Sequence, residues 1–282
     1  MEECKKYIVM DAEKKKELES AAIRLRKKSL EMAYNTGKTG AHLGGGLSMV
    51  EIFTVLYNAI ISVDANDPYN ISRDRVIVSK GHCVLPYYLI LNELGFLSDN
   101  DIADFETNGS MLHGHATRNV KNGIEFSGGS LGLGLSYAVG VAVAGKLNKN
   151  PYKVYAIVGD GECNEGIVWE AFMSASHFKS DNLTVIIDHN KLQYDGEIST
   201  VMNTESLKEK LCAFGFQAIE VDGHNVEDLY NAFNQKTTNK PLAIIAHTIK
   251  GKGVSYMENR KEWHHSTLSK EQYEIAISEQ PN

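Results

Sequence analysis

The stretch VYAIVGDG, at residues 154–161, is a short apolar run that leads straight into a glycine-rich turn. A second apolar run, LTVIID at residues 183–188, follows a segment of helical character at residues 167–178. Runs of this length that are rich in β-branched residues are typical of buried strands. A strand, a helix and a strand in this order predict a right-handed crossover with parallel strands. Asp160 and Asn190 would then lie just past the carboxyl ends of two parallel strands, where open α/β sheets bind ligands.

Asp160 and Asn190 carry hard oxygen donors, which suit Mg²⁺ or Ca²⁺ and are poor ligands for soft metals. Mg²⁺ takes only a few protein oxygens and completes its coordination with water and substrate phosphates. Gly159 and Gly161 flank the aspartate and let backbone N–H groups approach an anionic oxygen. An isolated Gly-Asp-Gly is more often a simple turn, but the asparagine after the second strand favours a metal-bridged diphosphate site.

The composition is ordinary for a soluble globular protein, with 282 residues, 43% hydrophobic content, 23% charged content and a formal net charge of −7. The negative charge argues against nucleic acid or an anionic membrane as the main partner. Four scattered cysteines, the lack of a signal-peptide pattern and the short, glycine-rich apolar run at residues 131–145 indicate a cytoplasmic protein without a membrane span. The length is near the upper limit for one core, so we expect a single domain over residues 1–282.

Further strands and helices complete the predicted fold. Additional strands are expected at residues 75–78, 216–221 and 242–247, and helices at residues 11–35, 48–60, 86–94, from 98 onward, 134–147, 226–233 and near the end of the chain. Ser48 with Glu51, and Ser98 with Asp101, have the spacing of capping boxes that begin helices. This alternation predicts an α/β fold of three layers, doubly wound, with a mostly parallel sheet and helices on both faces.

A series of short loop motifs, taken together, resembles the transketolase family from about residue 30 to residue 268. The motifs are GAHLGG at 40–45, SKGH at 79–82, GH at 114–115, SLG at 130–132, GDG at 159–161 with Glu165, DHNK at 188–191 and KGKG at 250–253. The resemblance implies thiamine diphosphate and Mg²⁺ (or Ca²⁺) as cofactors, with the metal held by Asp160, Asn190 and the backbone carbonyl of Leu192. The cofactor-binding residues that it implies are His82, Gly129, Leu131, Gly159, Asp160, Gly161, Glu165, Asn190, Lys250 and His264.

The reaction of this family transfers a two-carbon ketol unit from a ketose donor to an aldose acceptor. By motif match, the catalytic residues are four of the ten histidines: His42, His82, His115 and His264. The resemblance assigns His82 and His115 to the donor's first hydroxyl group and the reaction intermediate. It assigns His42 and His264 to proton transfer at the donor's C3 hydroxyl and the acceptor's carbonyl oxygen. Imidazole titrates near neutrality, so it can donate or accept a proton as such steps require.

The resemblance covers only the part of a full-length family chain that binds the diphosphate. Full-length family chains continue into a second domain, which supplies the glutamate that activates thiamine. The chain therefore resembles the N-terminal subunit of a split transketolase. The implied partner is a C-terminal transketolase subunit carrying that glutamate, with two copies of each subunit in a heterotetramer and sugars as substrates.

Three positions depart from the family pattern. The family's His-Pro-Glu reads HAT at residues 115–117, and its Trp-His-Gly reads WHH at residues 263–265, which leaves the choice between His264 and His265 open. Glu106 stands where many full-length members carry a phosphate-binding arginine. If Glu106 points into the substrate channel, the enzyme would prefer sugars without a terminal phosphate or bind the phosphate elsewhere; otherwise Glu106 is a surface residue.

Two other functions share part of this pattern. The diphosphate-binding subunit of a 2-oxo-acid dehydrogenase also has the Gly-Asp-Gly and asparagine unit, but the loops of His42, His82 and His115 argue against it. A non-catalytic homologue could act as a scaffold or regulatory partner, although the predicted metal ligands and all four histidines are present.

Overall fold

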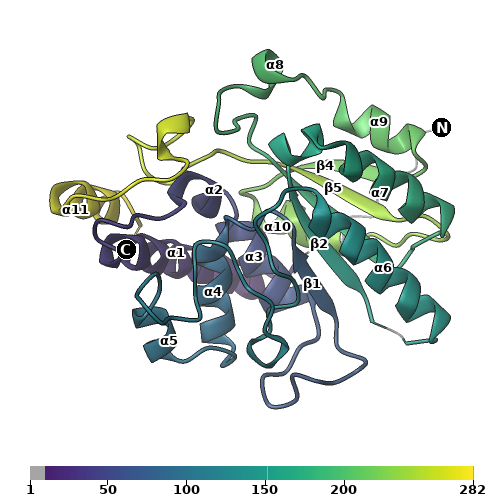
Figure 1. Cartoon of the computed structure of the whole chain (residues 1–282), viewed down its shortest axis with the longest axis horizontal. Helices are drawn as coiled ribbons and strands as arrows, with labels where there is room; N and C mark the ends of the chain where they lie inside the picture. The colour runs from purple at the N-terminus through teal and green to yellow at the C-terminus, as the bar shows by residue number, and fades with distance from the viewer. Residues whose placement is uncertain (1–9, 151, 282) are drawn as a thin grey trace.

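A five-stranded parallel sheet forms the centre of the computed structural model, which describes residues 10–150 and 152–281 (Figure 1). Its strands are β1 (Arg75–Val78), β2 (Val154–Gly159), β3 (Leu183–His189), β4 (Gln217–Asp222) and β5 (Leu242–His247). They lie in the order β1-β2-β3-β5-β4, and each neighbouring pair is parallel. The predicted strands are therefore confirmed, and the sheet is parallel throughout.

Helices cover both faces of the sheet because successive strand residues point into two different cores. Ile157 and Ile186 belong to the core shared with helices α1, α3, α4 and α10, whereas Val158 and Ile187 belong to the core shared with α6, α7 and α9. All four side chains are fully buried. Parallel strands covered on both faces read as continuous apolar runs, which is why the sequence pattern identified them. This arrangement confirms the predicted doubly wound α/β fold.

The helical segments connect the strands and surround the sheet (Figure 1). The α-helices are α1 (Ala12–Asn35), α2 (Leu43–Leu47), α3 (Val50–Val55), α4 (Val84–Glu93), α5 (Asp99–Ala103), α6 (Leu133–Leu147), α7 (Gly166–His177), α8 (Ile198–Val201), α9 (Leu207–Ala213), α10 (Val226–Phe233) and α11 (Lys270–Ser278). A π-helical turn, η1 (Leu56–Ile60), extends α3, and the 3₁₀ turns are η2 (Val120–Asn122), η3 (Gly161–Asn164) and η4 (Lys261–Trp263). The sequence pattern did not predict α2, α8 and α9.

One of the two predicted capping boxes is confirmed and the other is wrong. Ser98 accepts a hydrogen bond from the backbone of Asp101, whose side chain accepts one in return at the start of α5. Ser48 begins no helix, because it is the C-cap residue of α2 and α3 begins after Met49. Its hydroxyl group donates to the carboxylate of Asp188 at 2.8 Å. The serine therefore ends one helix and contacts the sheet edge rather than beginning a helix.

Three cysteines lie in the described part of the chain. Cys83 and Cys163 are buried, Cys212 is exposed, and all three are free thiols; the fourth, Cys4, lies outside the described residues. Within residues 10–150 and 152–281, no helix combines the length and the apolar character needed to cross a membrane. The assignment of residues 1–282 to a single domain stays a prediction.

Candidate active site

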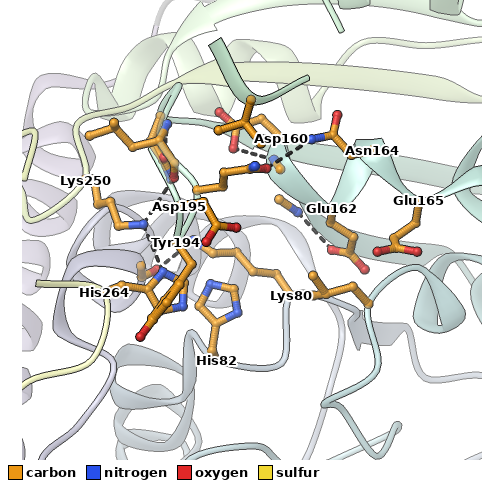
Figure 2. Close-up of a pocket in the computed structure, with 18 of the residues that line it drawn as sticks. Lys80, His82, Asp160, Glu162, Asn164, Glu165, Tyr194, Asp195, Lys250 and His264 are labelled. Carbon is orange, nitrogen blue, oxygen red and sulfur yellow. Dashed lines mark hydrogen bonds between the residues drawn. The ribbon is translucent and has the colours of Figure 1, made fainter. Parts of the chain in front are cut away.

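A cavity of about 580 Å³ opens at the carboxyl ends of the central strands (Figure 2). The residues predicted to bind the cofactor all line it: His82, Gly129, Leu131, Gly159, Asp160, Gly161, Glu165, Asn190, Lys250 and His264. His115 and Leu192 line it as well. These residues follow β1, β2, β3 and β5 or precede α6 and α7, so the sheet topology brings together segments that are far apart in the sequence.

The predicted metal donors lie side by side after β2 and β3. Asp160 is 3% exposed, and its carboxylate accepts hydrogen bonds from the backbone of Gly161 at 2.8 Å and of Lys191 at 2.5 Å. Asn190 is also buried, and its Oδ1 accepts from the Leu192 N–H at 3.0 Å. Burial and repulsion from Asp188 raise the pKa of Asp160 to about 7. The raised pKa shows that the nearby positive charges do not offset the burial of this carboxylate, so these oxygen donors fit a hard divalent cation.

Lys250 connects the metal donors with the histidines. Its Nζ donates to the carbonyl oxygen of Leu192 at 3.1 Å and lies 3.0 Å from Nδ1 of His264, as the dashed lines in Figure 2 show. Burial and the charge of Lys80 lower the pKa of Lys250 to about 8. A carbonyl oxygen has two lone pairs, so the Leu192 oxygen can accept from Lys250 and still face a cation.

A buried ion pair under the cavity holds the amide of Asn190. Lys80 is 2% exposed and Asp188 is fully buried, and their side chains are paired. Asp188 also accepts from Asn190 Nδ2 at 3.0 Å, from Ser48 and from the hydroxyl of Thr248. Burial alone would raise the pKa of Asp188, but Lys80 and these donors hold it below its usual value. Because Nδ2 of Asn190 is fixed on Asp188, its Oδ1 points away from this ion pair.

Glu162 ties together three of the loops that surround the cavity. Its carboxylate is 3% exposed and accepts from the backbone N–H groups of Gly132 at 2.7 Å and Gly159 at 3.0 Å. It also accepts from the hydroxyl of Ser79. Gly132 has φ 83°, a left-handed conformation that favours glycine, and it is the residue before α6. Glu162 therefore fixes the loop of the SLG motif against the end of β2.

The four predicted catalytic histidines form one cluster with His42 at its centre. The ring centroid of His42 lies 5.6 Å from His82, 5.1 Å from His115 and 5.6 Å from His264. The ring of His265 is nearer still, at 4.6 Å. His42 Nδ1 is buried and has no hydrogen-bond partner among the described residues. Burial, followed by the electrostatic effect of the neighbouring His265, His115 and His264 side chains and of Lys250, lowers the pKa of His42 to about 3. The central imidazole is thus neutral near pH 7 and keeps one nitrogen free for a ligand.

Glu106 lies neither free on the surface nor in the lining of the cavity. It is half-buried, its backbone N–H donates to the Leu112 oxygen at 3.1 Å, and its carboxylate accepts from the Gly114 N–H. Tyr88 donates to the carbonyl oxygen of His113 at 2.9 Å on the same loop. The carboxylate therefore holds the loop that presents His115.

Several residues that line the cavity are not among the predicted site residues: Gly45, Lys80, Glu162, Asn164, Gln193, Tyr194, Asp195, Val201 and Met202. Lys80 has a usable signal, since it is a charged residue directly after an apolar strand. Tyr194 and Asp195 lie in the loop after Asn190, and Val201 belongs to the unpredicted helix α8. Their positions depend on how this loop folds back over the sheet edge, which no periodic pattern reveals.

Comparisons with known proteins give the family. Residues 19–279 match the family described as "Transketolase, thiamine diphosphate binding domain". The chain is 43% identical to a protein of Phocaeicola vulgatus named as a subunit of apulose-4-phosphate transketolase, over 93% of both chains. It is 36% identical to 6-deoxy-6-sulfo-D-fructose transketolase subunit SqwG of a Clostridium species, over 95% of this chain and 98% of that one. Human transketolase is 38% identical over 97% of this chain, which spans 43% of the human protein.

Solved structures agree with the sequence relatives. The transketolase from Leishmania mexicana superimposes with a TM-score of 0.85 at 29% identity, over 92% of this chain and 40% of that one. The transketolase from Campylobacter jejuni gives a TM-score of 0.84, also at 29% identity, over 95% of this chain and 43% of that one. Since the family match runs through nearly all the described residues and the structural match spans more than nine-tenths of the chain, the chain belongs to the transketolase family and carries its thiamine diphosphate binding domain.

Proposed function

We propose that this chain is the diphosphate- and metal-binding subunit of a two-chain transketolase, which transfers a two-carbon ketol unit from a ketose to an aldose. The observation that carries the proposal is one cavity lined by hard oxygen donors, two lysines and three histidines, with His42 packed against the rings of all three histidines. Two relatives of nearly the same length are named as subunits of transketolases, which supports a division of the enzyme between two chains.

In this proposal Asp160, Asn190 and the Leu192 carbonyl would hold Mg²⁺ (or Ca²⁺), and the ammonium of Lys250 would bind the diphosphate. Thiamine diphosphate, when bound, supplies the nucleophilic carbon that takes up and releases the two-carbon unit. The cavity fits this group because its floor combines buried anionic donors for a cation with a buried ammonium for an anion.

The histidines divide the remaining work according to their places. His82 and His264 line the cavity beside Lys80 and Lys250, where they would contact the cofactor and the two carbons being transferred. His115 also lines the cavity but is exposed, so it would bind the sugar hydroxyl groups at the entrance. His42 is neutral and has a free buried nitrogen, which suits the acceptance and return of a substrate proton.

An exposed apolar face around α6 and α7 is the surface that we assign to the partner chain. Its large side chains are Leu131, Leu133, Tyr137, Leu147, Met173 and Phe178. The two helices pack against each other (Figure 1). Leu131, shortly before α6, and Glu165, just before α7, both line the cavity. A chain that covers this face would therefore reach the cavity with its own side chains. We propose that the partner contributes the glutamate that activates thiamine and that two copies of each subunit assemble.

We also propose that the protein works in the cytoplasm. The free thiols of Cys83, Cys163 and Cys212 support a reducing compartment.

The test combines the purified chain with its partner chain, thiamine diphosphate and Mg²⁺. Ketol transfer from a panel of ketoses to a panel of aldehydes is measured for the chain alone and for the pair, and the mass of the pair is measured in solution. We expect activity only in the pair. Full activity of the chain alone would contradict the division between two subunits. A pair that binds the cofactor but transfers no ketol unit would favour the non-catalytic homologue.

A further inference from the structure

His265 belongs to the histidine cluster but lies outside the cavity lining. Its ring meets the ring of His42 edge-on, with centroids 4.6 Å apart and planes inclined by 77°. His265 is exposed and is not part of the cavity lining, whereas its neighbour His264 lines the cavity. Two consecutive imidazoles thus face different parts of the same site.

A backbone bridge fixes this position. Ala41 and Ser266 form an antiparallel bridge, with both N–H···O hydrogen bonds at 3.0 Å. The next pair across this bridge is His42 and His265, so their side chains are neighbours by the geometry of antiparallel pairing. The proximity of the two rings is therefore set by the backbone rather than by a chance side-chain rotamer.

The two neighbouring histidines differ in their surroundings. His264 Nδ1 is 3.0 Å from the Lys250 ammonium, and its ring packs edge-on against Tyr194 at the end of the cavity that holds the metal donors (Figure 2). His265 lies outside the cavity lining, beside His42 and near His115, which itself lines the cavity. A sugar whose two transferred carbons lie in the cavity must extend its other carbons outward past the rim of the cavity.

We propose that His265 is a specificity-determining residue, whose imidazole hydrogen-bonds a hydroxyl group of the sugar beyond the two transferred carbons. This inference rests on the proposed transketolase function. It assigns His264 to the cofactor end and His265 to the substrate end, and it gives this chain a sugar contact that a glycine at the same position could not make.

The experiment uses the chain assembled with its partner and compares acceptors of different length. Glycolaldehyde is too short to reach the rim, whereas a longer aldose must pass it. His265→Gly should lower kcat/KM about tenfold for the longer aldose, the effect of one lost hydrogen bond. The value for glycolaldehyde should stay within about twofold, because the cavity itself is unchanged. His265→Asn, which keeps a donor and an acceptor, should recover part of the loss.

Two further measurements separate this role from a structural one. Calorimetric titration with thiamine diphosphate and Mg²⁺ should give the same affinity for His265→Gly and wild type. Glu274→Gln, an exposed substitution on α11, should change neither acceptor's kinetics. An equal loss for both acceptors, or a parallel loss of cofactor affinity, would overturn the inference, and so would unchanged kinetics with the longer aldose. Absence of ketol transfer in the wild-type pair would overturn the proposed function itself, and the inference with it.

Discussion

Replacing Asp188 by asparagine removes the carboxylate that neutralises Lys80 while leaving the shape of the side chain almost unchanged. Both residues are buried, at 0% and 2% exposed, so water can do little to solvate the charge that remains on the lysine. The asparagine oxygen can still accept from Lys80 and Asn190, and its amide group can donate to the hydroxyl of Thr248, which rotates. The substitution therefore tests the charge of the pair more than its hydrogen bonds.

The expected cost follows from the burial of the pair. Removing one partner of a buried ion pair leaves an uncompensated charge and costs about 3–5 kcal/mol of unfolding free energy. Because the hydrogen bonds largely persist, we expect Asp188→Asn to reduce the free energy of unfolding by about 3 kcal/mol, near the lower end of this range. The loss should shrink as the pH rises. An unpaired buried Lys80 has a lowered folded-state pKa, so the unfolded chain binds more protons and stability increases with pH.

The assay is urea unfolding of wild type, Asp188→Asn, Lys80→Met and the double variant at pH 7.5 and 9. The double variant should be more stable than Asp188→Asn alone, since it carries no buried charge at this pair. Glu274→Gln breaks the exposed pair with Lys270, whose side chains are 63% and 79% exposed, and should change stability by less than about 0.5 kcal/mol. A loss below about 1 kcal/mol for Asp188→Asn, or a double variant less stable than the single one, would refute this account of the pair.

Three other substitutions have defined outcomes. Asp160→Ala removes the only carboxylate among the predicted metal donors and should weaken cofactor binding in calorimetric titration by at least ~100-fold, or about 2.7 kcal/mol; unchanged affinity would remove the assignment. His42 has a pKa lowered to about 3 by burial and the surrounding imidazoles, so at pH 5.5 the unfolded chain binds a proton there that the folded chain does not. The free energy of unfolding should therefore fall by about 1 kcal/mol between pH 7.5 and 5.5 because of His42. Urea unfolding should show that this loss is absent in His42→Gln and retained in His177→Gln. Equal pH dependence in both variants would argue against this role of His42. Glu106→Arg should lower kcat/KM about tenfold for matched sugars with and without a terminal phosphate, because arginine cannot accept the hydrogen bond from the Gly114 N–H. A gain in kcat/KM confined to the phosphorylated sugar would instead show that Glu106 acts through its charge.

The strands and the residues at their ends are predictable from the sequence because their signals are local. A run such as residues 183–188 is buried on both faces, and the residue that follows it must lie at the sheet edge. This logic alone brings Asp160, Asn190 and His82 to one edge of the sheet. The resemblance to the family adds His42, His115 and His264, which no periodic pattern connects with the sheet.

The errors and omissions arise where a residue is held by a distant part of the chain. Ser48 has the sequence spacing of a helix cap, but the glycines before it allow α2 to begin earlier, and its hydroxyl bonds to Asp188 on another strand. The pairing of Lys80 with Asp188 depends on β1 and β3 lying on either side of β2. For Glu106 the sequence suggests only a channel or a surface position, since nothing in it indicates that this carboxylate accepts from Gly114.

The same long-range contacts explain how loops of different origin form one site. The loop of His42 is fixed by its bridge to Ser266, and the Gly44 oxygen accepts from the Gly251 N–H at 3.0 Å, so the C-terminal loops hold the N-terminal one in place. The loop of His115 has separate supports in Glu106 and Tyr88. A substitution at one support should therefore displace one histidine rather than the whole cluster. The cofactor end, which rests on Lys80, Asp188 and Glu162, can then stay constant while the sugar end varies, and His265 is a position where substrate choice can change without loss of the shared chemistry.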